Sequence, residues 1–139
     1  MIKLSRELVA PCGMNCGVCK RYLATVRGLA GGKGMPACTG CRPQNRKCAL
    51  IIRGCRLLSG KKINFCFECP DFPCARLERL NHRYTTRYHT DLVENLLAIK
   101  ELGLNRWLKK QAGKWQCPQC GGTISIHDRR CYDCGYASG

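Results

Sequence analysis

The residues best placed to do chemistry are the fourteen cysteines, most of which occur in pairs separated by two residues. A Cys-x-x-Cys pair can direct two thiolates at one metal ion, and such pairs are typical ligands where thiols stay reduced. The sequence shows neither the apolar core of a secretory signal peptide nor an apolar run long enough to span a bilayer. We therefore expect a cytoplasmic metal–thiolate protein with no membrane partner, rather than a disulfide framework.

The C-terminal part contains the clearest metal site, with two cysteine pairs separated by ten residues. Its four expected ligands are Cys117, Cys120, Cys131 and Cys134. A glycine follows the second cysteine of each pair and lets the backbone turn around the ion. This pattern predicts a zinc ribbon with a closed tetrahedral site. Between the pairs, residues 123–126 are expected to form a short strand, followed by a turn in which His127 makes local hydrogen bonds.

The ten cysteines from Cys12 to Cys74 allow two groupings. In the first grouping they form two four-cysteine zinc sites, because a C-x2-C-x18-C-x2-C spacing is within the range of such sites. The second site of the chain then consists of Cys16, Cys19, Cys38 and Cys41. The third site consists of Cys48, Cys55, Cys66 and Cys69. This grouping leaves two additional thiols, Cys12 and Cys74, which zinc alone does not need.

The second grouping involves iron. Cys12, Cys16 and Cys19 have the C-x3-C-x2-C spacing with which radical-SAM enzymes hold a [4Fe–4S] cluster. Those enzymes need a large partial barrel that this chain cannot build, so radical chemistry is not expected. A plain [4Fe–4S] cluster stays open, with Cys74 or a cysteine of the 38–41 pair as its fourth ligand. Zinc and a [4Fe–4S] cluster are thus alternatives for this part of the chain.

Three segments are expected to position these ligands. Residues 1–75 form a cysteine-rich metal-binding module with short helices, residues 76–114 form a helical segment, and residues 115–139 form the zinc ribbon. The predicted fold class is small, metal-stabilised α+β, with a helical hairpin packed against the metal module. A chain of 139 residues has a thin apolar core, and structural metals supply the missing folding free energy.

Helices are predicted from apolar spacing and end signals. One short helix should follow Cys19, and a second should cover residues 48–58. In the helical segment an apolar stripe steps by three and four residues through Leu77, Leu80, Tyr84 and Tyr88. Asp91, with Glu94 three residues later, predicts the N-cap of the next helix, and Gly103 predicts its end.

Positive charge is concentrated in the first half of the chain. The formal net charge of +15 falls to about +9 if three four-thiolate sites each hold a divalent ion. Between residues 8 and 67 there is no acidic residue, whereas eleven residues are Lys or Arg. Such a distribution favours a polyanionic partner, and nucleic acid is the commonest.

One stripe of arginines is expected on the first long helix, at Arg76, Arg79, Arg83 and Arg87. Guanidinium groups about one turn apart can follow the phosphates of an RNA strand, although a solvated helix face would have the same pattern. Further candidate contacts are Arg42, Arg46, Lys47, Lys61, Lys62, Lys109 and Lys110. Near the ribbon, the rings of Trp115, Tyr132 and Tyr136 either stack on unpaired bases or form the core of the ribbon.

Catalytic residues cannot be read from the sequence, because its three histidines and nine carboxylates suggest no nucleophile–base set. We therefore expect a zinc-stabilised binding module for RNA or a ribonucleoprotein, rather than an enzyme. The alternative is an iron–sulfur redox or accessory protein that binds an acidic protein partner.

The ordered cysteine motifs resemble a known family. They are Cys12-Gly-Met-Asn-Cys16-Gly-Val-Cys19, Cys38-Thr-Gly-Cys41 and Ile63-Asn-Phe-Cys66-Phe-Glu-Cys69-Pro-Asp-Phe-Pro-Cys74. These motifs resemble domain of unknown function 3795, which is found in bacteria and archaea. The segment from Arg83 to Leu96 and the ribbon that follows Trp115 look like the longer members of that family. The resemblance implies that the metal module, helices and ribbon belong together, and it implies no activity. The strong basic charge departs from the family pattern.

Overall fold

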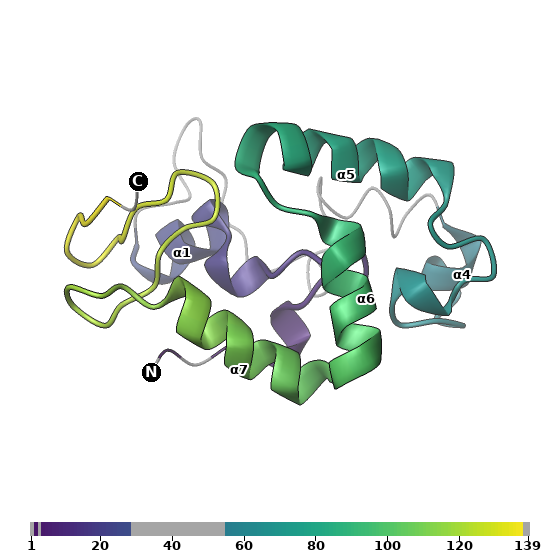
Figure 1. Cartoon of the computed structure of the whole chain (residues 1–139), viewed down its shortest axis with the longest axis horizontal. Helices are drawn as coiled ribbons and strands as arrows, with labels where there is room; N and C mark the ends of the chain where they lie inside the picture. Colours follow the sequence, from purple (N-terminus) through teal and green to yellow (C-terminus); the bar gives the residue numbers. More distant parts are fainter. Residues whose placement is uncertain (1, 3, 29–54, 138–139) are drawn as a thin grey trace.

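Three consecutive helices make up the largest part of the described chain (Figure 1). The computed structural model describes residues 2, 4–28 and 55–137. Helix α5 spans Ala75–Tyr88, α6 spans Leu92–Leu102 and α7 spans Leu104–Trp115. Helices α5 and α7 lie on opposite sides of the view, and α6 runs from one to the other and contacts both. These three helices cover most of the residues from 75 to 115.

The ends of these helices follow the signals in the sequence. The Asp91 side chain accepts a hydrogen bond of 3.0 Å from the main-chain N–H of Glu94 and so caps α6. Helix α5 ends at Tyr88, and the next residue, His89, has a left-handed φ of 52°, a common conformation just after a helix. Gly103, with φ of 86°, separates α6 from α7. The chain therefore changes direction twice within the helical segment.

Short helices and turns carry the cysteine-rich part of the chain. They are η1 (Arg6–Leu8), η2 (Cys16–Val18), α1 (Lys20–Val26), α4 (Arg56–Ser59) and η4 (Cys66–Glu68). Helix α1 confirms the helix expected after Cys19. The helix expected over residues 48–58 falls largely outside the described residues, whose second part begins at residue 55. Among the described helices none is long and apolar enough to cross a membrane.

The α+β class is not confirmed, because the described chain is mostly helical. In residues 4–28 and 55–137, β structure is limited to isolated antiparallel bridges, among them Gln116–Thr123 and Ile124–Cys131. Thr123 and Ile124 each form one bridge, whereas a strand was expected over residues 123–126. The physical reason is length: turns interrupt the ribbon so often that the extended pieces are shorter than an ordinary strand.

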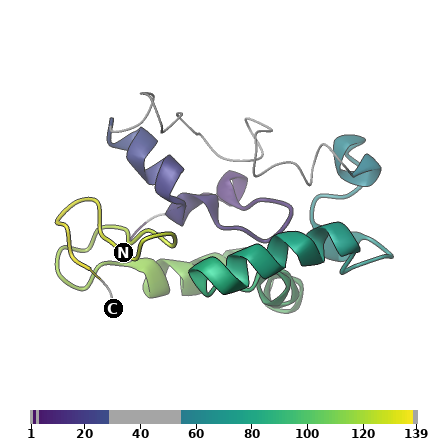
Figure 2. The ribbon, with the colours of Figure 1, turned by 90° about the horizontal axis from the view of Figure 1, so that it is seen from above.

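The larger of two apolar clusters joins the first cysteine segment, α5, α6, the end of α7 and the ribbon. Its most deeply buried members include Met14, Val18, Leu77, Leu92, Leu96, Trp115, Ile124 and Ile126. The expected buried stripe of α5 is confirmed at Leu77 and Tyr84. Seen from above, α1 lies to one side of the layer that contains α5 and α7 (Figure 2). The ribbon and the first cysteine segment are thus held by the same packing.

Candidate metal centre

The four cysteines of the ribbon meet at one point. The sulfur atoms of Cys117, Cys120, Cys131 and Cys134 all lie within 4.8 Å of one another. Sγ of Cys120 is 3.5 Å from Sγ of Cys131, and Sγ of Cys117 is 3.7 Å from Sγ of Cys134. Zn–S bonds of 2.3 Å in a tetrahedral site place the sulfurs about 3.8 Å apart. The four thiols are therefore arranged to bind a metal ion.

The backbone builds the two halves of this site in the same way. Gly121 and Gly135, which follow the second cysteine of each pair, have φ of 80° and 79°. Their N–H groups each donate a 2.9 Å hydrogen bond to the carbonyl oxygen of the first cysteine of the same pair. Only glycine adopts this conformation without steric cost. The role expected for these glycines is confirmed.

The thiols of the ribbon differ in how readily they ionise. Burial opposes the Cys117 thiolate, but hydrogen bonds from the main-chain N–H groups of Cys120 and Gln119 outweigh it and lower its pKa to about 7. At Cys120 the N–H of Gly122 favours the thiolate, yet the neighbouring thiols raise the pKa to about 12. A metal binds thiolates, so its charge must displace the remaining protons.

Contacts distant in sequence attach the ribbon to the first cysteine segment. The N–H of Ile126 donates a 2.9 Å hydrogen bond to the carbonyl oxygen of Val18. Nε and Nη2 of Arg27 donate to the two carboxylate oxygens of Asp133 over 2.8 and 2.7 Å. Asp133 lies between Cys131 and Cys134. These bonds hold the second half of the ribbon site against α1.

His127 does more than the local bonding expected of it. Its main-chain N–H does bond the nearby Ser125 hydroxyl over 3.2 Å. Its ring, however, accepts at Nδ1 a 3.2 Å hydrogen bond from the N–H of Lys20, 107 residues away. The ring also packs edge-on against Tyr88, with centroids 4.5 Å apart. His127 is therefore a second attachment of the ribbon, and a hydrogen-bond acceptor of this kind has no local sequence signal.

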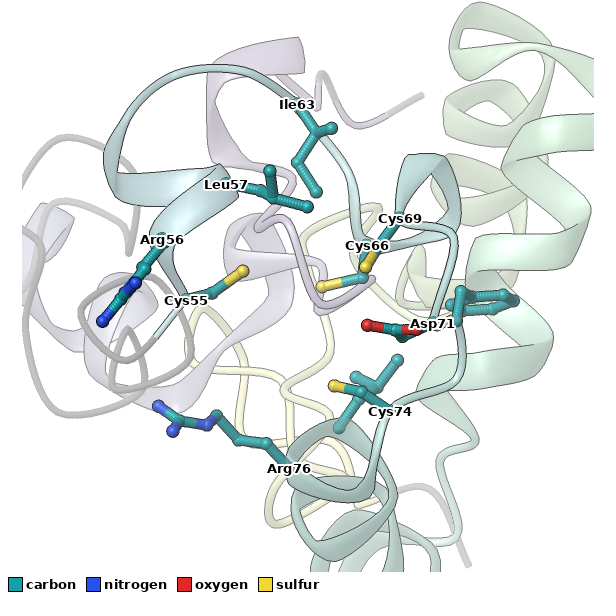
Figure 3. Close-up of a pocket in the computed structure, with 11 residues that line it drawn as sticks. Cys55, Arg56, Leu57, Ile63, Cys66, Cys69, Asp71, Cys74 and Arg76 are labelled. Carbon is teal, nitrogen blue, oxygen red and sulfur yellow. The ribbon is translucent and has the colours of Figure 1, made fainter.

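A second group of cysteines lines a cavity of about 280 Å³. Its members are Cys55, Cys66, Cys69 and Cys74, and Figure 3 shows their sulfur atoms pointing into the same space. Arg56, Asp71 and Arg76 line it as well. The structure thus places Cys74 with three residues of the expected third site. Asp71 was not predicted as a residue of this site. Its position between Cys69 and Cys74 in the sequence could have indicated that it lines the same cavity.

Cys66 lies at the centre of this group. Burial, followed by the charges of Cys12, Cys74, Cys55 and Cys69, raises the pKa of the Cys66 thiol to about 12. The N–H of Cys66 donates a 2.9 Å hydrogen bond to the carbonyl oxygen of Pro11, which joins this loop to the segment of Cys12. Both thiols left over in the zinc grouping, Cys12 and Cys74, are therefore close to Cys66.

The other expected ligands are only partly described. Cys16 and Cys19 are buried beside α1, whereas Cys38, Cys41 and Cys48 lie outside the described residues. The described cysteines form no disulfide with one another. Within the described ranges, the ribbon is the only group of three or more His, Cys, Asp or Glu residues whose ligand atoms all lie within 4.8 Å.

The candidate nucleic-acid contacts lie on several elements. On α5, the four arginines Arg76, Arg79, Arg83 and Arg87 are exposed. Also exposed are Lys61, Lys62, Lys109 and Lys110, while Arg42, Arg46 and Lys47 lie outside the described residues. Trp115 is only 3% exposed and belongs to the core, so the alternative of stacking on bases is excluded for its buried ring.

The first cysteine motifs lie in a segment that matches a known family model. A family model described as "Protein of unknown function (DUF3795)" matches residues 8–79. The chain belongs to this family. The resemblance in the motifs is thereby confirmed, and the DUF3795 segment contains all four cysteines of the cavity but none of the ribbon. No curated protein and no solved structure matches the chain.

Proposed function

We propose that this protein is a zinc-stabilised module that binds RNA through the basic face of α5. The observation that carries the proposal is the compact ribbon site, whose four sulfur atoms lie within 4.8 Å of one another. Four thiolates at this spacing match the structural, closed type of zinc site. In such sites the metal supplies folding free energy, so the ribbon is expected to support the binding surface rather than to catalyse a reaction.

Metal analysis tests the zinc part of the proposal. The purified protein should lose about one zinc per chain on Cys134→Ser, because a tetrahedral site needs all four thiolates. Asp133→Ser changes the neighbouring position to the same residue without removing a ligand, and it should retain the zinc. Iron in place of zinc at the ribbon, or zinc retained by Cys134→Ser, would contradict the proposal.

The exposed face of α5 supports RNA as the partner. Its four arginines occupy positions i, i+3, i+7 and i+11, adjacent to the buried stripe that contains Leu77 and Tyr84. From Arg76 to Arg87 the helix rises about 16 Å. Among the described residues, none of the four arginines forms an ion pair. Their guanidinium groups are thus available to phosphates, which arginine binds through two parallel hydrogen bonds.

A pair of charge-matched variants tests this surface. One variant changes the four arginines of α5 to glutamine. The control changes four exposed cations outside the candidate contacts to glutamine, namely Lys100, Arg106, Lys114 and Arg130. Binding to a single-stranded RNA of about 20 nucleotides is measured by fluorescence anisotropy over a range of salt concentrations. We expect the α5 variant to lower the salt slope by about 3, because each lost phosphate contact on a single strand removes about 0.7.

The control should bind RNA with a nearly unchanged slope. Equal losses in both variants would show that net charge alone attracts RNA, which would refute the α5 site. The alternative is an iron–sulfur redox or accessory protein with an acidic protein partner, and binding of polyglutamate in place of RNA would support that alternative.

A further inference from the structure

We infer that Cys55, Cys66, Cys69 and Cys74 bind a [4Fe–4S] cluster in the cavity that they line. This centre is separate from the ribbon and shares only Arg76 with the arginine face of α5, so it goes beyond the proposed function. The inference rests on where the four sulfurs point, on the cavity that they share and on what surrounds them.

The ends of three helices direct these four sulfurs to one place. Cys55 precedes α4, Cys66 begins η4, Cys69 follows η4 and Cys74 precedes α5. Figure 3 shows that all four side chains point their sulfur atoms into the space between these elements. Main-chain hydrogen bonds from Cys69 to Cys66 and from Phe72 to Cys69, each of 3.1 Å, define the loop. The site is therefore built by the fold, although its residues span twenty positions of the chain.

The sulfurs of the cavity are less closely grouped than those of the ribbon. A tetrahedral zinc ion needs sulfurs about 3.8 Å apart, as in the ribbon. In the cavity no three of the described ligand atoms lie within 4.8 Å of one another. A [4Fe–4S] cluster binds each thiolate to a different iron atom, so its four sulfur ligands lie farther apart. The cavity of about 280 Å³ provides space for such a core.

The lining of the cavity suits a cluster as well. Apolar side chains of Leu57, Ile63, Phe72 and Leu77 contribute to the wall, and limited contact with solvent is one of the features that tune a cluster. Four thiolates and an oxidised core carry a net charge of about −2. Arg56 and Arg76, which also line the cavity, offset most of the negative charge of the cluster and of the Asp71 carboxylate.

The test is reconstitution of the full chain under anaerobic conditions with iron and sulfide, followed by removal of unbound metal. We expect about four iron and four sulfide per chain, with broad absorption at about 400 nm. Cys69→Ser and Cys74→Ser should each lower the bound iron more than fivefold while the ribbon keeps its zinc. The retained zinc and an unchanged helical circular dichroism spectrum show that these variants have folded.

Two control variants define the ligand set. Cys134→Ser removes a ribbon thiol and should lose zinc but keep iron, which separates this inference from the proposed function. Cys12→Ser removes a buried thiol close to Cys66 that does not line the cavity, and it should also keep iron. Three results would overturn the inference: no iron after reconstitution, zinc that Cys74→Ser releases, or iron lost by Cys12→Ser and kept by Cys55→Ser.

Discussion

Nη2 of Arg129 donates a 2.7 Å hydrogen bond to the carbonyl oxygen of Tyr88 and so joins the ribbon to the end of α5. The same guanidinium group lies 4.8 Å from the centroid of the Trp115 ring. Arg129 has a left-handed φ of 58°, which a non-glycine residue adopts only at some energetic cost. These contacts show that this cation serves to hold the fold together.

Replacement of Arg129 by lysine should destabilise the protein by about 1–2 kcal/mol, because an ammonium group cannot both stack on an indole ring and reach the same carbonyl oxygen. The measurement is urea unfolding of the zinc-loaded protein. Arg130 is exposed and provides the matched control, since Arg130→Lys should change the unfolding free energy by less than about 0.5 kcal/mol. Equal effects of the two substitutions would disprove the structural role of Arg129.

Substitution of Gly13 should be among the most damaging changes in the chain. Gly13 has φ of 91°, and a Cβ atom there would lie 2.7 Å from the carbonyl oxygen of Leu92 and 2.9 Å from Cγ of Leu96. Gly13→Ala therefore combines backbone strain with a clash against α6, and we expect a loss of about 3 kcal/mol.

The substitution Gly28→Ala measures the cost of backbone strain without a clash. Gly28 has φ of 71°, but a Cβ atom there would meet none of the described residues within 4 Å. Gly28→Ala should then cost only the backbone strain, about 1 kcal/mol. Thermal or urea unfolding of both variants gives the difference, and a Gly13→Ala protein as stable as Gly28→Ala would contradict the close packing of this loop on α6.

The stability of the protein should fall in mildly acidic solution because of His127. Burial lowers the pKa of His127 below its ordinary value of 6.5, and its Nδ1 atom must stay unprotonated to accept the bond from Lys20. The unfolded chain therefore takes up the proton first as the pH falls. Stability is complete above pH 6.5 and decreases as the pH falls from there towards the pKa of the folded state.

The substitution His127→Asn tests this prediction. The asparagine oxygen can replace Nδ1 as an acceptor without titrating, so the variant should show a flatter dependence of unfolding free energy on pH between about 5 and 7. Zinc content is measured at each pH, because loss of the metal is a separate effect of acid. An unchanged pH dependence at constant zinc content would show that His127 does not contribute.

Removal of zinc should loosen the ribbon before it affects α6. The amides of Ile124, Ile126 and Cys131 bond the backbone of Trp115, Val18 and Tyr136, and a structural zinc at the four cysteines, as proposed above, would stabilise the turns that position them. With a chelator we expect their hydrogen exchange to accelerate at least about 100-fold. The amides of Leu96 and Ile99 in α6 should accelerate less. Uniform acceleration would indicate that the ribbon is not a separate unit of unfolding.

Local features of this fold were predictable from the sequence, whereas contacts between distant segments were not. The cap at Asp91, the helix end at Gly103 and the turns at Gly121 and Gly135 depend on neighbouring residues, so their sequence patterns were sufficient. The expected strand over residues 123–126 was wrong in extent, since its alternation in sequence says nothing about the partners needed to extend a ladder.

The two cysteine sites show the same difference between local and long-range features. The compact four-cysteine group of the ribbon follows from two local pairs and a short interval between them. The position of Cys74 beside Cys55 depends instead on how α5 packs, and no spacing rule relates these two residues. The acceptor role of His127 has the same origin, because its donor lies 107 residues earlier in the chain.

That separation also imposes an order on synthesis. At about 5–20 residues per second, the ribosome adds His127 roughly 5 to 20 s after Lys20. During this interval the carbonyl oxygen of Val18 and the N–H of Lys20 have not met the ribbon groups that they bond in the finished fold. The N-terminal cysteines therefore emerge before the last surface that packs against them has been made. During this interval a chaperone or metal donor can reach the N-terminal cysteines before the ribbon packs against them.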